Sequence, residues 1–120
     1  MLYLAAFLVL ITGIAHSYLG ERYILIRLFR RQDLPKLFGG TAFTKGTLRF
    51  AWHLTTVAWL GFAYMLAAIA GQGLDGDHTL KAIAAVALVS GFLPLLFTRG
   101  RHLSWIVFFL VAALAMLSLR

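Results

Sequence analysis

Residues 2–19 read LYLAAFLVLITGIAHSYL, and this stretch decides the fold. It contains no Asp, Glu, Lys or Arg, and its length lies within the roughly 17 to 25 residues that a membrane-spanning helix needs. Three further apolar stretches of similar length follow it, at residues 50–70, 80–97 and 103–119. We therefore expect an all-α fold, a four-helix transmembrane bundle in which residues 1–120 form one integral membrane domain.

The composition points the same way. Of the 120 residues, 62% are hydrophobic and 12% are charged, and the mean hydropathy is +0.89. A water-soluble chain of this length has too small an interior to bury so much apolar surface, so soluble enzyme folds are excluded. The chain has no cysteine, which excludes disulfides, iron–sulfur clusters and cysteine nucleophiles. It also lacks a phosphate-binding loop, a dinucleotide fingerprint and a Gly-x-Ser-x-Gly motif.

The uneven distribution of basic residues predicts the orientation. The formal net charge is +7, and nine of the eleven Lys and Arg residues follow the first or third stretch: Arg22, Arg27, Arg30, Arg31, Lys36, Lys45, Arg49, Arg99 and Arg101. Lys81 and Arg120 fall on the other side. Because Lys and Arg concentrate in cytoplasmic loops, both termini are expected outside the cytoplasm, with anionic lipid at the basic face. These charges flank apolar stretches, so nucleic acid is not an expected partner.

The first connection is expected to contain an interfacial segment. Residues 23–31 are both basic and apolar, which predicts that they extend the first helix and then lie along the cytoplasmic membrane surface as a basic amphipathic segment. Pro35 and the pair Gly39-Gly40 interrupt this segment, and Thr47 is placed to cap the second helix. Near the end of the third stretch, Pro94 is expected to kink or end the helix.

Four ionisable side chains are predicted near the cytoplasmic ends of the helices: His16, Glu21, His53 and His102. Counting about 1.5 Å per residue, His16 and His53 lie at one level, and Glu21 and His102 lie about 5 to 8 Å nearer the cytoplasm. Imidazole and carboxylate groups bind Zn, Cu, Fe or Ni. The leading hypothesis is therefore a transition-metal site for storage, transfer or redox conversion, and an oxidoreductase activity stays open. Thioethers suit Cu(I), so Met1, Met65 and Met116 favour copper over zinc or iron.

Other interpretations of these residues are open. His16 would hydrogen-bond Thr56 or Tyr64, and Glu21 would pair with Arg49, in a non-catalytic structural or assembly subunit. His16 and His53 could instead be axial ligands of haem b, or the His and Glu side chains could relay protons. Serine hydrolysis is not expected, because the adjacent Ser17 and His16 point about 100° apart on a helix.

Two segments carry a resemblance. The run His16-Ser17-Tyr18-Leu19-Gly20-Glu21-Arg22, of pattern H-S-x-L-G-E, is followed by Arg49-Phe50-Ala51-Trp52-His53-Leu54. Both segments resemble a group of small, uncharacterised four-span inner-membrane proteins of bacteria. The resemblance implies a bacterial inner-membrane location and draws attention to His16, Glu21 and His53, but it implies no activity.

Small residues predict self-association. The first and third stretches carry more small side chains than one four-helix packing needs, so a second copy of the chain is expected to bury them in a homo-oligomer.

Overall fold

The computed structural model describes residues 1–71 and 73–119, and within them it contains helices and no strand. The elements are α1 (Leu2–Leu19), a π-helical segment η1 (Gly20–Leu25), α2 (Ile26–Leu28), α3 (Ala42–Gly71), α4 (Gly76–Phe97) and α5 (Ser104–Leu117). Together α1, η1 and α2 form one continuous rod of 27 residues, Leu2–Leu28. The predicted all-α fold is confirmed, with each of the four apolar stretches in a helix.

One predicted helix cap is wrong, and two other predicted boundaries are confirmed in part. Helix α3 begins at Ala42, so Thr47 lies inside it and does not cap it, and the Thr41 carbonyl instead accepts from the Lys45 amide at 2.9 Å. Helix α4 continues through Pro94 to Phe97, where the Thr98 hydroxyl donates to the Pro94 carbonyl at 2.6 Å. The segment 23–31 is helical only to Leu28, and a turn follows.

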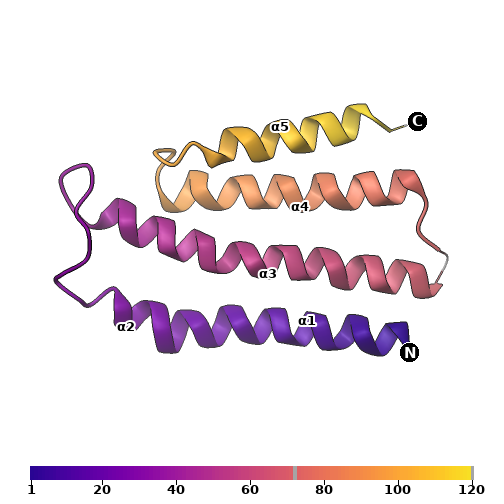
Figure 1. Cartoon of the computed structure of the whole chain (residues 1–120), viewed down its shortest axis with the longest axis horizontal. Helices are drawn as coiled ribbons and strands as arrows, with labels where there is room; N and C mark the ends of the chain where they lie inside the picture. The colour runs from indigo at the N-terminus through magenta and orange to yellow at the C-terminus, as the bar shows by residue number, and fades with distance from the viewer. Residues whose placement is uncertain (72, 120) are drawn as a thin grey trace.

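The four long helical segments lie side by side in a single layer, in the order α1, α3, α4, α5 (Figure 1). Each packs only against its neighbours in this row among the described residues, and the overall dimensions are 51 × 32 × 13 Å. The four predicted helices are confirmed, and within the single chain they form an open row. In a closed four-helix bundle α1 would also contact α5, but here both faces of the layer stay uncovered.

Close approaches at glycines hold the row together. A Cβ atom on Gly20 would lie 2.0 Å from the Trp52 indole nitrogen, and one on Gly46 would lie 2.1 Å from the Phe97 carbonyl oxygen. The same holds further along, where Gly61 meets Val86 and Gly91 meets Phe109. Each helix pair of the row therefore meets where one helix has no side chain, as is typical of close helix packing in membranes.

The charges gather at one end of the layer. The connections between α2 and α3 and between α4 and α5 lie at the same end, and both termini lie at the opposite end (Figure 1). Nine basic residues thus surround one end, as the sequence predicts; Arg120 lies outside the described residues. By length and composition, the helices Leu2–Leu28, Ala42–Gly71 and Gly76–Phe97 could each cross a membrane, whereas α5 has 14 residues and is shorter.

Candidate functional site

The polar side chains of the α1–α3 interface recur every three or four residues, so those of each helix lie on one face. Ser17 and Glu21 are one turn apart on the first rod, and Arg49, His53 and Thr56 recur at the same spacing on α3. The helix widens to a π-helix just where Glu21 lies, and the Ile26 amide donates to the Glu21 carbonyl five residues back. Segments of π-helix are rare and are frequent at functional sites.

Glu21 is held by two partners from α3. The Arg49 guanidinium donates to both carboxylate oxygens, Nη2 to Oε1 at 2.7 Å and Nε to Oε2 at 3.2 Å. The His53 Nε2 atom lies 3.1 Å from Oε2. The predicted ion pair between Glu21 and Arg49 is therefore confirmed. A carboxylate with no partner among apolar side chains would cost several kcal/mol, so the two-pronged contact accounts for its placement on this largely apolar rod.

The contacts of His53 continue into a chain of hydroxyl groups. The Ser17 Oγ atom lies 2.8 Å from His53 Nδ1 and 2.7 Å from Thr56 Oγ1, and Thr56 donates to the Gly13 carbonyl at 3.2 Å. An ionised carboxylate can only accept, so Glu21 places the proton of neutral His53 on Nε2. The lone pair of Nδ1 can then accept the Ser17 hydroxyl, provided that Thr56 turns its single proton from the Gly13 carbonyl to Ser17 Oγ. Ser17, His53 and Glu21 thus form a serine–histidine–carboxylate series.

This series lines an open groove. The groove has a volume of about 580 Å³, and its lining residues are Ile14, Ser17, Tyr18, Glu21, Arg22, Ile26, His53 and Thr56. The side chains of Glu21 and His53 remain 30% and 21% exposed, so a bound molecule could reach them. The His53 ring also packs against Phe97 of α4, with ring centroids 6.3 Å apart, which restrains its orientation.

His16 lies elsewhere. Its ring stacks on Trp52 with centroids 4.6 Å apart, Trp59 flanks it at 5.2 Å, and its Nε2 atom lies 3.0 Å from Thr55 Oγ1. The Trp52 indole donates to the His16 carbonyl at 3.1 Å. His16 lines a second groove, which shares no residue with the groove at Ser17. The structure therefore does not bring His16 and His53 together, either at a shared metal or on the two sides of a haem.

His102 is also separate. It lies in the connection before α5, where its Nδ1 atom is 2.8 Å from Ser104 Oγ and its ring contacts Phe43 and Phe50. Of the four predicted ligands, only Glu21 and His53 meet. Across residues 1–71 and 73–119, no three His, Asp or Glu side chains come close enough to hold one metal ion.

Sequence reasoning missed Ser17. It compared Ser17 only with its neighbour His16, whereas the partner of Ser17 is His53 on another helix. A signal was available, because Ser17 and Glu21 share one helical face, and Arg49, His53 and Thr56 share another. Which of those faces meet depends on the packing of α1 against α3.

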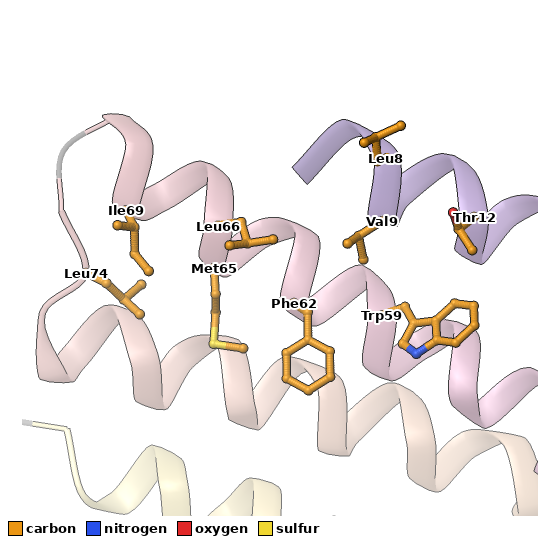
Figure 2. Close-up of a pocket in the computed structure, with 9 residues that line it drawn as sticks. All are labelled: Leu8, Val9, Thr12, Trp59, Phe62, Met65, Leu66, Ile69 and Leu74. Atoms are coloured by element: carbon orange, nitrogen blue, oxygen red, sulfur yellow. The ribbon is translucent and has the colours of Figure 1, made fainter. Parts of the chain in front are cut away.

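A third groove lies toward the other end of α1 and α3 (Figure 2). It has a volume of about 670 Å³ and is almost wholly apolar, with Leu8, Val9, Trp59, Phe62, Met65 and Leu66 among its lining residues. Thr12 supplies its one aliphatic hydroxyl. The groove can hold an aliphatic chain, but it presents no group capable of acid–base chemistry.

Comparisons of this chain with models of known protein families, with curated proteins and with solved structures found no match.

Proposed function

We propose that the chain is an integral membrane protein of the bacterial inner membrane, with both termini outside the cytoplasm. Support comes from three helices of sufficient length and apolar character, and from the many large apolar side chains exposed on the layer. In water such a surface would be a liability, whereas lipid accepts it. The basic end then lies at the cytoplasmic surface, against anionic lipid.

Within the membrane, the protein is an acyl-transfer enzyme that uses Ser17 as nucleophile. The observation that carries this proposal is the series Ser17–His53–Glu21, with distances of 2.8 Å and 3.1 Å, beside an open groove. A nucleophile hydrogen-bonded to a base, with the base held by a third group, is the arrangement that activates serine. The chain of hydroxyl groups stops at the Gly13 carbonyl, which favours local acid–base chemistry over proton transport.

The chemical step follows from the geometry. Ser17 Oγ forms a bond to an ester carbonyl carbon while its proton passes to His53 Nδ1, and the resulting imidazolium is stabilised by Glu21. The bond to the alcohol then breaks, and His53 returns the proton to the leaving oxygen. Water hydrolyses the acyl-serine by the same route, passing its proton through His53. Arg49 holds the Glu21 carboxylate in place throughout.

Two features distinguish this site from better-known triads. The imidazole faces serine with Nδ1 and the carboxylate with Nε2, which reverses the usual assignment of the two nitrogens. Both nitrogens can carry the proton, so the exchange of roles preserves base catalysis. The Thr56 hydroxyl, 2.7 Å from Ser17 Oγ, would donate to the oxyanion after releasing the Gly13 carbonyl. With one hydroxyl in place of paired amides, we expect slow turnover.

The test is covalent labelling of the detergent-purified protein with a fluorophosphonate, followed by peptide mass spectrometry. We expect an adduct on Ser17 that disappears in Ser17→Ala. His53→Gln cannot act as a base and should slow labelling by about a hundredfold or more.

Ser104 supplies the matched control. Its Oγ atom is also 2.8 Å from a histidine, His102, but no carboxylate in the described residues holds that ring. Ser104→Ala should therefore leave labelling unchanged. Absence of an adduct on Ser17 in protein of native helical content, or equal labelling rates in native protein and His53→Gln, would refute the proposal.

The metal hypothesis stays a prediction, with less support than acyl transfer. Among the four expected ligands only Glu21 and His53 are adjacent, and Arg49 already supplies the positive charge at Glu21. A copper, zinc or iron ion there would have to compete with that guanidinium. Haem b, the structural-subunit alternative and the predicted homo-oligomer also stay predictions; the uncovered faces of the layer favour a second copy.

A further inference from the structure

We infer that the substrate of Ser17 is an anionic acyl lipid of the glycerophospholipid type, with its phosphate at Arg22 and its ester carbonyl at Ser17. This inference rests on the proposed acyl-transfer function and assigns its substrate class. It depends on three properties of the groove. Its lining has an apolar and a polar part, Arg22 has no carboxylate partner among the described residues, and Arg22 lies at a suitable distance from Ser17.

The groove changes character along its length. Ile14, Tyr18 and Ile26 give it apolar walls, while Arg22 and the reactive side chains supply the polar part. Tyr18 is 63% exposed and Ile14 is 53% exposed, so the groove opens sideways at the surface of the layer. In a membrane that side faces lipid, so a molecule enters from the bilayer with its apolar chains already in place.

Arg22 is the groove's available cation. Arg49 is engaged by Glu21 and by the face of Phe29, Arg31 by Asp33, and Arg27 lies over the Tyr23 ring. Arg22 forms no ion pair with any carboxylate of the described residues, and its side chain is exposed. A guanidinium at the membrane boundary that has no carboxylate partner is a phosphate-binding group by charge and by geometry.

The spacing matches the order of groups in such a lipid. Arg22 lies five residues after Ser17, which is about 7 Å along the helix axis toward the basic end. A glycerophospholipid carries its phosphate at the headgroup level, and its ester carbonyls lie one glycerol unit deeper. With the phosphate at Arg22, the ester carbonyl reaches the depth of Ser17, and the acyl chain continues along Ile14. A water-soluble ester would gain nothing from those apolar walls.

The experiment compares two lipids that share a phosphate but differ in net headgroup charge, one anionic and the other zwitterionic. Native protein is reconstituted in vesicles of phosphatidylglycerol or phosphatidylcholine with identical acyl chains, and released fatty acid is measured by mass spectrometry. We expect release from phosphatidylglycerol to be about tenfold faster. Its phosphate can form a charge-assisted contact with Arg22, whereas in phosphatidylcholine the positive choline group beside the phosphate weakens that contact. Arg22→Gln should bring the ratio of the two rates close to one.

Arg101→Gln is the matched control, since it removes the same charge at the same end of the molecule from a residue that lies over Phe38 and does not line the groove. It should keep the preference. Three outcomes would each overturn the lipid assignment while leaving the acyl-transfer proposal standing. These are equal rates on both lipids, an unchanged preference in Arg22→Gln, and labelling of Ser17 without fatty-acid release from either lipid. A failure of acyl transfer itself would appear separately, as the absence of a fluorophosphonate adduct on Ser17.

Discussion

At the scale of single residues, Gly20 determines how closely α1 approaches α3. The Trp52 ring lies where a side chain at position 20 would be, and from there it stacks on His16 and donates to the His16 carbonyl. The space beside Gly20 is therefore filled by an indole of the same chain. The residue that makes Gly20 necessary is thus Trp52, 32 positions later in the sequence.

Gly20→Ala should therefore be destabilising. Its Cβ atom would fall 2.0 Å from the Trp52 nitrogen, so the indole must move and lose its hydrogen bond and its stacking. Overpacking of this kind costs about 2 kcal/mol in the free energy of unfolding. Thermal unfolding in detergent measures the loss.

Gly13→Ala is the comparison for that experiment. A Cβ atom at Gly13 would meet Trp59 at 3.6 Å and Thr56 at 3.7 Å, which are ordinary contacts. We expect no loss of stability, and even a small gain from helix propensity. Equal destabilisation by both substitutions would contradict the role given to Gly20.

At the scale of elements, α4 begins with a well-defined cap. Asp75 has an extended backbone, and its side chain accepts from the His78 amide at 2.7 Å and lies 2.8 Å from His78 Nδ1. The hydrogen bond from the His78 amide, followed by the bond from the His78 ring, holds the pKa of the Asp75 carboxyl below its ordinary value. Because the pKa of Asp75 is lowered in the folded protein, the cap stabilises α4 at pH values above the ordinary pKa of an Asp carboxyl. This stabilisation is lost as the pH falls through the lowered pKa.

Amide hydrogen exchange at His78 and Thr79 tests this cap. In Asp75→Ala the His78 amide should exchange faster at neutral pH because it loses its side-chain acceptor, whereas the Thr79 amide keeps the Asp75 carbonyl as its acceptor and should change less. Asp75→Asn keeps a capping oxygen and should stay close to native protein there, but it should lack the loss of protection, relative to intrinsic exchange rates, that we expect of native protein below about pH 4. An identical acid response in Asp75→Asn and native protein would show that another group causes it.

At the scale of the whole molecule, the layer has a sidedness that can be measured. Its two ends differ sharply in charge, and the chain has no cysteine, so single cysteines can be introduced without background. Gln32 lies at the basic end and Gly76 at the other end, and both are exposed.

A membrane-impermeant maleimide should label Gly76→Cys in intact cells and should label Gln32→Cys only after the membrane is opened. This result is expected for the proposed orientation, in which the basic end faces the cytoplasm. The reverse pattern would invert the orientation, and with it the leaflet from which Ser17 takes its lipid.

Much of this protein is determined by its sequence alone. Apolar stretches such as residues 2–19 require helices, because each backbone polar group must be bonded within its own segment where water is absent. The clustering of nine basic residues sets the two ends apart. The Glu21–Arg49 pair is also predictable, because it needs only the depth of each residue along its helix.

Only the tertiary structure decided which helix faces meet. The sequence places His16 and His53 at the same depth and so suggests one site. The rotation of α1 against α3 is set by the fit of Trp52 on Gly20. This rotation turns Ser17 and Glu21 toward His53 and leaves His16 against the tryptophans. The single layer is also decided by the tertiary structure, because the apolar pattern of the sequence does not show whether α5 packs against α1. Depth along a helix is a local property of the chain, whereas rotation about its axis is set by side chains distant in sequence.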